Sequence, residues 1–183
     1  MFGSSILEVA IGVVFVFILV SIICSAIREG IEAWLKTRAA YLEYGIRELL
    51  HDRSGNGLAN AFYNHPLIYS LFSGEYRPRE YSDSPSILAG GQNLPSYIPA
   101  GNFATALMDI AARGPKTDLQ TGDPNPGPIT LNSIRENILN IDNQAVRRAL
   151  LTALDNADGD LTKARANLEA WFNSGMDRVS GWY

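Results

Sequence analysis

The feature that most constrains this chain is the apolar run Ile6–Ile27, which reads ILEVAIGVVFVFILVSIICSAI. Beyond Glu8 the run has no charged side chain, and its small or polar interruptions are Gly12, Ser21 and Ser25. As a helix, the residues from Val9 to Ala26 would rise about 27 Å, close to the ~30 Å hydrocarbon core of a bilayer. A helix is also the only single segment that satisfies its own backbone polar groups in lipid. We therefore predict a single-pass transmembrane anchor over residues 1–27.

Two other interpretations of the apolar run are a cleaved signal peptide and a buried core helix. A signal peptide has a basic leading segment, a short apolar run and a cleavage site with small residues. The first five residues, MFGSS, contain no basic side chain. Cleavage at Cys24-Ser25-Ala26 would divide a helical pattern that continues without a breaker into REGIEAWLK. The uncharged run is also long for a core helix, so the membrane span is favoured.

The sequence also predicts how the anchor begins and how far its helix continues. Ser5 and Glu8 have the spacing of a capping box, in which each side chain accepts from the other residue's amide. No proline interrupts Arg28–Asp52, where helix-forming residues are frequent and apolar residues recur at helical spacing. We expect a helical extension of the span over 28–53 that runs to about Leu50, before the turn-forming segment SGNG at 54–57.

The distribution of basic residues predicts the orientation of the chain. All fifteen Lys and Arg residues follow the apolar run, whereas the residues before it include none. Lys and Arg close to a span are enriched on the cytoplasmic side. We therefore expect a protein of the bacterial inner (cytoplasmic) membrane, with the N-terminus outside and the main domain in the cytoplasm.

The remaining residues, 54–183, have the pattern of a helical domain with two long loops, at 73–101 and 113–129. Short helices are expected at Leu58–Tyr63 and from Pro66 onward, where proline suits the first turn of a helix. Further helices should follow N-caps, at which short polar side chains accept backbone amides. The expected N-caps are Asn102 for a helix over 103–112, Thr130 for a helix with Ile134 and Ile138, Asp142 for the next helix, and Asp160 for the last. The fold class is therefore all-α.

Aromatic side chains mark the surfaces that we expect to be buried or covered. The loop 73–101 contains Tyr76, Tyr81, Tyr97 and Ile98, and is too apolar for a free linker, so we expect an ordered strap. The last helix repeats apolar residues at the helical period: Leu161, Ala164, Leu168, Trp171, Phe172 and Val179. The predicted interaction residues are Trp34, Tyr97, Trp171, Phe172, Trp182 and Tyr183. Small residues predicted to pack between helices in the membrane are Ser21, Ser25, Ala26 and Gly30.

No pattern in the sequence predicts a catalytic, cofactor-binding or metal-binding residue. The net charge of −4 does not favour nucleic-acid binding, and one cysteine with two histidines does not favour a structural zinc site. The acidic segment 155–160 resembles a calcium loop, but alignment on Gly159 places Leu154 and Arg165 at ligand positions. We interpret it as a turn between helices. His65, which precedes a proline, is interpreted as a turn residue rather than a general base.

Two further segments carry a resemblance. PSYIPAGNFATALMDI (Pro95–Ile110) and LLTALDNADGDLTKARANLEAWFNSGMDRVSGWY (Leu150–Tyr183), together with the N-terminal span, resemble a family of uncharacterised bacterial membrane-anchored proteins. The resemblance implies a membrane-anchored architecture in which a basic stretch and further transmembrane helices follow the Gly-Trp-Tyr segment. It implies no activity, cofactor or catalytic residue.

Three functions remain open at the level of sequence. The first is a non-catalytic accessory or structural subunit of a larger membrane complex, for example a respiratory or photosynthetic one, with the lipid bilayer and integral-membrane proteins as partners. The second is a self-assembling membrane scaffold, a homo-oligomer, that recruits a soluble cytoplasmic partner. The third is an enzyme with its site in the loop 73–101, which the sequence disfavours because no acid–base pair, nucleophile or metal cluster converges there.

Overall fold

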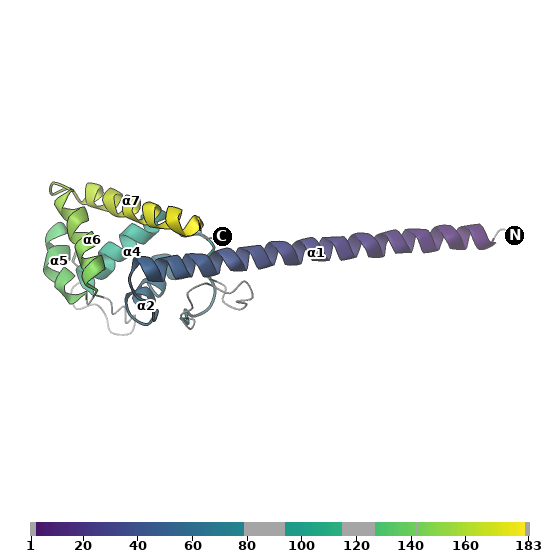
Figure 1. Ribbon diagram of the computed structural model, residues 1–183, viewed down its shortest axis with the longest axis horizontal. Helices are drawn as coiled ribbons and strands as arrows, with labels where there is room; N and C mark the ends of the chain where they lie inside the picture. The colour runs from purple at the N-terminus through teal and green to yellow at the C-terminus, as the bar shows by residue number, and fades with distance from the viewer. Residues whose placement is uncertain (1–2, 79–93, 115–126, 142, 182–183) are drawn as a thin grey trace.

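The computed structural model describes residues 3–78, 94–114, 127–141 and 143–181, and every regular element in these ranges is helical. The all-α class is therefore confirmed. Figure 1 shows one long helix that projects from a compact group of shorter ones. The elements are α1 (Gly3–Leu49), α2 (Leu58–Tyr63), α3 (Pro66–Tyr69), α4 (Ala100–Arg113), α5 (Leu131–Asn137), the 3-10 turn η1 (Ile138–Asn140), α6 (Gln144–Asp155) and α7 (Leu161–Ser180).

The helix α1 runs without a break from the predicted membrane span into the domain (Figure 1). Its end at Leu49 confirms the predicted extension, and the helix passes through Cys24 and Ser25 without interruption. The predicted capping box is wrong, because α1 begins at Gly3 and Ser5 therefore lies inside the helix. Serine in a first turn does not stop a helix, so nothing at Ser5 prevents an earlier start.

The core of the domain is organised around α4, which packs against α2, α3, α5 and α7. Phe103 near the start of α4 lies between two other rings, with ring centroids 5.2 Å from Phe62 of α2 and 4.4 Å from Phe172 of α7. Leu107 and Ile110 follow on the same helix and are also fully buried. Such stacked and tilted ring pairs add to the free energy gained by burying their apolar area.

The last helix, α7, packs on both α4 and α1. The predicted apolar face is confirmed: Ala164, Leu168, Phe172 and Val179 are buried, and Leu161 and Trp171 are partly buried against the core. Two glycines permit the close contact with α1. A Cβ at Gly45 would lie 2.5 Å from a methyl carbon of Val179, and one at Gly175 would lie 2.9 Å from a methyl carbon of Leu49. The two helices are antiparallel, because the later residue of α7 meets the earlier residue of α1.

Side-chain caps define most of the helix starts. Thr130 and Ser133 form a capping box at α5, and Asp160 accepts from the amides of Thr162 and Lys163 at α7, as predicted. The turn before Asp160 confirms the interpretation of 155–160 as a turn between helices.

Two predicted caps are wrong. The α6 cap is Asn143, whose side chain accepts from the amides of Ala145 and Val146, and the predicted Asp142 lies outside the described residues. Helix α4 begins at Ala100 after Pro99, and the side chain of Asn102 donates to the carbonyl of Leu67 at 3.4 Å. Pro99 has an extended conformation, and the helix begins with the next residue, Ala100, so Asn102 lies inside the first turn.

Both described ends of the long loop pack on the helices. Tyr76 is buried and stacks on Tyr63 at a centroid distance of 4.3 Å. At the other end, Leu94 and Ile98 are buried. The expected strap is therefore confirmed at its ends, whereas Tyr81 and the rest of residues 79–93 lie outside the described part of the chain.

This packing predicts that Phe172→Ala lowers the free energy of unfolding by about 3–5 kcal/mol, the usual cost of deleting a buried ring. Trp171→Ala should cost less, because the indole is only partly buried beside Phe103 (5.9 Å between centroids). Urea titration of the full chain in detergent, followed by circular dichroism, measures both. Tyr97→Ala, at a ring that is 69% exposed, is the control and should leave the midpoint unchanged. An unchanged midpoint for Phe172→Ala would contradict the assigned core.

Candidate functional site

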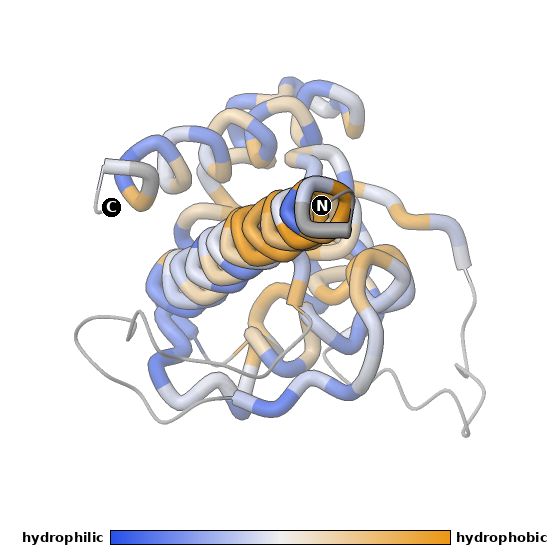
Figure 2. Tube along the Cα trace, turned by 90° about the vertical axis from the view of Figure 1, so that its right-hand side faces the viewer, coloured by the Kyte–Doolittle hydropathy of each residue, from blue (hydrophilic) through white to orange (hydrophobic). Residues whose placement is uncertain are grey.

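The N-terminal part of α1 is apolar and makes no buried contact with the described domain. Large apolar side chains from Ile6 to Leu35 are each between 42% and 73% exposed. Figure 2, which looks along α1 from its N-terminal end, shows this apolar helix standing out from a domain of mixed polarity. Within the described residues, α1 is the one helix long and apolar enough to cross a membrane. A bare apolar surface of this size is a candidate for burial in lipid or against protein.

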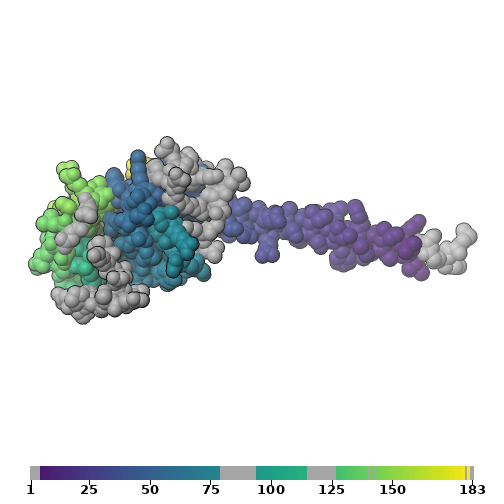
Figure 3. Space-filling view, turned by 90° about the horizontal axis from the view of Figure 1, so that it is seen from below, coloured from purple at the N-terminus to yellow at the C-terminus, as the bar shows by residue number. Residues whose placement is uncertain are grey.

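The small residues predicted to pack between helices all lie on this bare surface. Ser21, Ser25, Ala26 and Gly30 are exposed, and no atom lies within 4 Å of a Cβ built on Gly30. Figure 3 shows the same helix as a thin rod of side chains beside the bulk of the domain. These residues are therefore accessible to a second helix, and their role in packing stays a prediction.

Trp34 lies on α1 just before the helix enters the domain, and 57% of its surface is exposed. The guanidinium of Arg38, one turn further along, lies 5.0 Å from the centre of the indole ring. Such a cation–π contact at an exposed site is worth about 0.5–1 kcal/mol. The contact holds the indole of Trp34 against the surface of α1, on the side where Arg38 lies and the helix continues into the domain.

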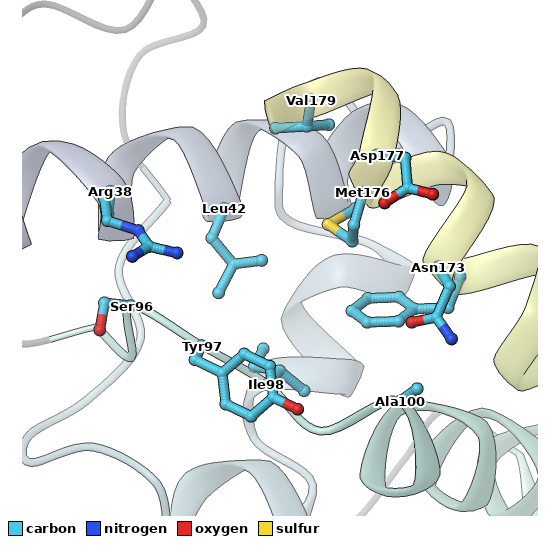
Figure 4. Close-up of a pocket in the computed structure, with 11 residues that line it drawn as sticks. Arg38, Leu42, Ser96, Tyr97, Ile98, Ala100, Asn173, Met176, Asp177 and Val179 are labelled. Atoms are coloured by element: carbon cyan, nitrogen blue, oxygen red, sulfur yellow. The ribbon is translucent and has the colours of Figure 1, made fainter. Parts of the chain in front are cut away.

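A pocket of about 200 Å³ lies where α1 enters the domain (Figure 4). Arg38 and Leu42 of α1 line one side, Tyr97 and Ile98 of the loop line another, and Met176 of α7 lies among the residues opposite. Small-molecule sites usually have volumes of about 300–1,000 Å³, so this pocket fits one large side chain better than a cofactor. Tyr97, one of the predicted interaction residues, lines this pocket and is 69% exposed.

The other predicted interaction residues fall into two groups. Phe172 is 3% exposed, and its ring is stacked on Phe103, so it belongs to the core of its own domain as well as to the lining of the pocket. Trp171 is partly buried against the same core. Trp182 and Tyr183 lie outside the described residues. Of the four that the structure describes, Trp34 and Tyr97 are therefore the exposed aromatic side chains, and Arg38 connects them, because it lies over the ring of Trp34 and lines the same pocket as Tyr97.

A buried polar cluster joins α1 to the strap. Glu43 and Arg47, one turn apart on α1, are both buried, and their side chains approach to 3.5 Å. The hydroxyl of Tyr76 donates to the Glu43 carboxylate at 3.2 Å. Burial, followed by the negative charge of Glu43, raises the pKa of both Tyr63 and Tyr76 above the usual tyrosine value. Both phenols therefore stay protonated, and Tyr76 remains a donor, throughout the neutral range.

A second polar contact, which the sequence did not reveal, joins His65 to Asp109. The Nδ1 atom of His65 accepts the amide of Leu67 at 3.3 Å as the N-cap of α3. With Nδ1 used as an acceptor, Nε2 is the ring nitrogen that donates to Asp109, at 3.1 Å. Asp109 also pairs with Arg113, whose side chain donates to the carbonyl of Gly127. The interpretation of His65 as a turn residue is thus confirmed, and the pair ties α3 to α4.

Part of these clusters had a sequence signal. Glu43 and Arg47 stand four residues apart, the spacing of a helical ion pair, but the pattern does not tell a buried pair from an exposed one. The partners Tyr76 and Asp109 lie 33 and 44 residues away from Glu43 and His65. Contacts across such distances depend on the fold and have no local pattern.

Comparisons with known protein families, with curated proteins and with solved structures found no significant match to this chain.

The buried tyrosines predict that stability falls at alkaline pH. The unfolded chain releases its tyrosine protons near pH 10, whereas the folded chain retains those of Tyr63 and Tyr76, so the free energy of unfolding decreases above pH 10. Each retained proton contributes a slope of about 1.4 kcal/mol per pH unit. Tyr76→Phe should reduce the slope by that amount between about pH 10.5 and 12, measured by urea titration. Tyr69→Phe, at an exposed ring, is the control, and equal slopes for Tyr76→Phe and the native chain would refute the assignment.

Proposed function

We propose that this chain is a non-catalytic accessory subunit of a larger bacterial membrane complex, anchored in the inner membrane by α1. The observation that carries the proposal is the contrast between the two parts of that helix. The large apolar side chains from Ile6 to Ile27 are exposed, whereas Ala39 and Ile46 near its other end are buried in the domain core. A bilayer is the environment that covers an apolar helix on all sides.

The length of exposed helix after the apolar run supports a subunit held at a distance from the membrane. The first charged residue after the run is Arg28, and the first buried residue is Ala39. The eleven residues from Arg28 to Arg38 correspond to a helical rise of about 16 Å. The domain would therefore stand clear of the lipid headgroups, at a height where it meets the cytoplasmic parts of neighbouring membrane proteins.

A structural role agrees with what the polar groups of the domain do. His65 and Asp109 join α3 to α4, and the Asp52 carboxylate accepts the amides of Gly55, Gly57 and Ala59 in the turn after α1. Glu43, Arg47 and Tyr76 connect α1 to the strap. Each of these groups is used to hold elements of the domain in place, which suits a subunit that bridges or stabilises its neighbours.

The proposed anchor predicts the orientation of the two ends of the chain. In a Cys24→Ser background, a cysteine at Ser5 should react with a membrane-impermeant maleimide in intact cells. A cysteine at the exposed Ala166 of α7 should react only after the membrane is permeabilised. The protein should also resist extraction by alkaline carbonate. Labelling of the Ala166→Cys variant in intact cells would show that the orientation is reversed.

The subunit role is tested by purification of the tagged full chain in mild detergent, with quantitative mass spectrometry of the co-eluting proteins. We expect at least one integral-membrane protein at a constant molar ratio to the chain. Homo-oligomers as the sole product would favour the self-assembling scaffold instead. Turnover of a substrate by the isolated chain would contradict the non-catalytic assignment.

A further inference from the structure

The face of α1 that packs on α7 continues beyond the end of α7. Gly45 and Leu49 of α1 contact Val179 and Gly175 of α7. Steps of three and four residues stay on one face of a helix, and counting back from Gly45 in such steps leads through Leu42 and Arg38 to four apolar side chains. These four, which we call the juxtamembrane stripe, are Ile27, Ile31, Trp34 and Leu35. They are between 42% and 58% exposed.

The uncovered stripe begins where α7 stops. α7 ends at Ser180, and Figure 1 shows its C-terminal end alongside α1, with no other described helix beside the part of α1 that projects from the domain. The pocket lies at the junction, since Arg38 and Leu42 line it from α1 and Val179 lines it from the last turn of α7 (Figure 4). The stripe and the pocket are thus a continuation of the interface between α1 and α7.

In the proposed orientation, lipid headgroups reach Ile27 and Ile31 but not the part of this surface from Trp34 to the pocket. Counted from Ile27 at the edge of the apolar run, Trp34 lies about 10 Å and Arg38 about 16 Å further along the helix. The headgroup region adds about 5–8 Å on each side of the hydrocarbon core, and a typical tilt of about 20° shortens these heights by less than a tenth. Trp34 and the pocket therefore lie beyond the headgroups, and a cover for them has to be protein.

A second copy of α1 laid in parallel on the same face is also disfavoured. A parallel helix in register with α1 would run from Ile27 to Leu49, and α7 already occupies that face at Gly45 and Leu49. A helix that binds to the juxtamembrane stripe therefore has to end where α7 ends. A helix that rises out of the bilayer beside α1 and stops at the height of Val179 meets this condition.

We propose that the juxtamembrane stripe and the pocket together bind one helix of an integral-membrane partner. The helix extends a transmembrane segment of the partner by two to three turns, covers Ile31 and Trp34 with an apolar face, and inserts an aromatic or aliphatic side chain from its end into the pocket. Arg28, one turn before Ile31 and Glu32, lies beside the stripe. A carboxylate of the partner close to the bilayer would complement this charge.

This inference rests on the proposed membrane subunit and specifies where its partner binds. It is tested with the full chain in native membranes, with a benzophenone amino acid in place of Trp34 or, as a matched control, Ala33 on the opposite side of α1. After irradiation, the tagged chain is purified and the cross-linked peptide is identified by mass spectrometry. We expect position 34 to cross-link to residues that directly follow a transmembrane segment of a partner, with at least a tenfold higher yield than position 33.

Substitutions provide the second measurement. Ile31→Glu should reduce the amount of this partner that co-purifies by at least tenfold, whereas Ala33→Glu, which adds the same charge on the other side, should leave it unchanged. Both variants should still resist carbonate extraction. Cross-links from position 34 to lipid, to a second copy, or to residues 79–93 or 182–183 of the same chain would overturn the proposal, as would full retention of the partner by Ile31→Glu. Loss of carbonate resistance in the native chain would instead refute the membrane anchor itself.

Discussion

The fold of the domain depends on α1, whose C-terminal end is buried in the core and whose N-terminal part is exposed. The C-terminal quarter of α1 contributes Ala39 and Ile46 to the core, and the same helix bears exposed apolar side chains along most of its remaining length. The aromatic cluster of Phe62, Phe103 and Phe172 forms next to it and joins α2, α4 and α7. The hydrophobic effect drives the burial of one end of α1 in the core, and it also favours a cover for the exposed part of the same helix.

Much of the fold follows from helical periodicity. The continuous α1, the apolar face of α7 and the caps at Thr130 and Asp160 are all visible as local patterns of residues. These features could be predicted because each depends on residues within about two turns of one another. The wrong caps at Ser5, Asn102 and Asp142 show the limit of the method. A short polar residue is compatible with several helix starts one or two residues apart, and the neighbouring elements decide between them.

The polar interior could not be predicted in the same way. Glu43, Arg47 and Tyr76 meet because the first residues of the strap pack on α1, and His65 meets Asp109 because α3 lies against α4. Gly45 and Gly175 have no pattern of their own either, although they set how closely α7 approaches α1. For the candidate site, the sequence predicted the exposed aromatic residues Trp34 and Tyr97. It did not predict the pocket that Tyr97 lines, because separate segments of the chain form it.

The unbroken path of α1 has a geometric consequence for any neighbour of the domain. Each residue of an α-helix advances the chain by about 1.5 Å and rotates it by about 100°. The number of residues from Arg28 to Arg38 therefore sets both the distance of the domain from the apolar run and the direction in which the domain faces around the helix axis. One residue inserted there would lift the domain only slightly but would turn it by more than a quarter of a circle about the axis of α1. The length of this segment therefore affects the direction in which the domain faces around the axis of α1 more strongly than its position along that axis.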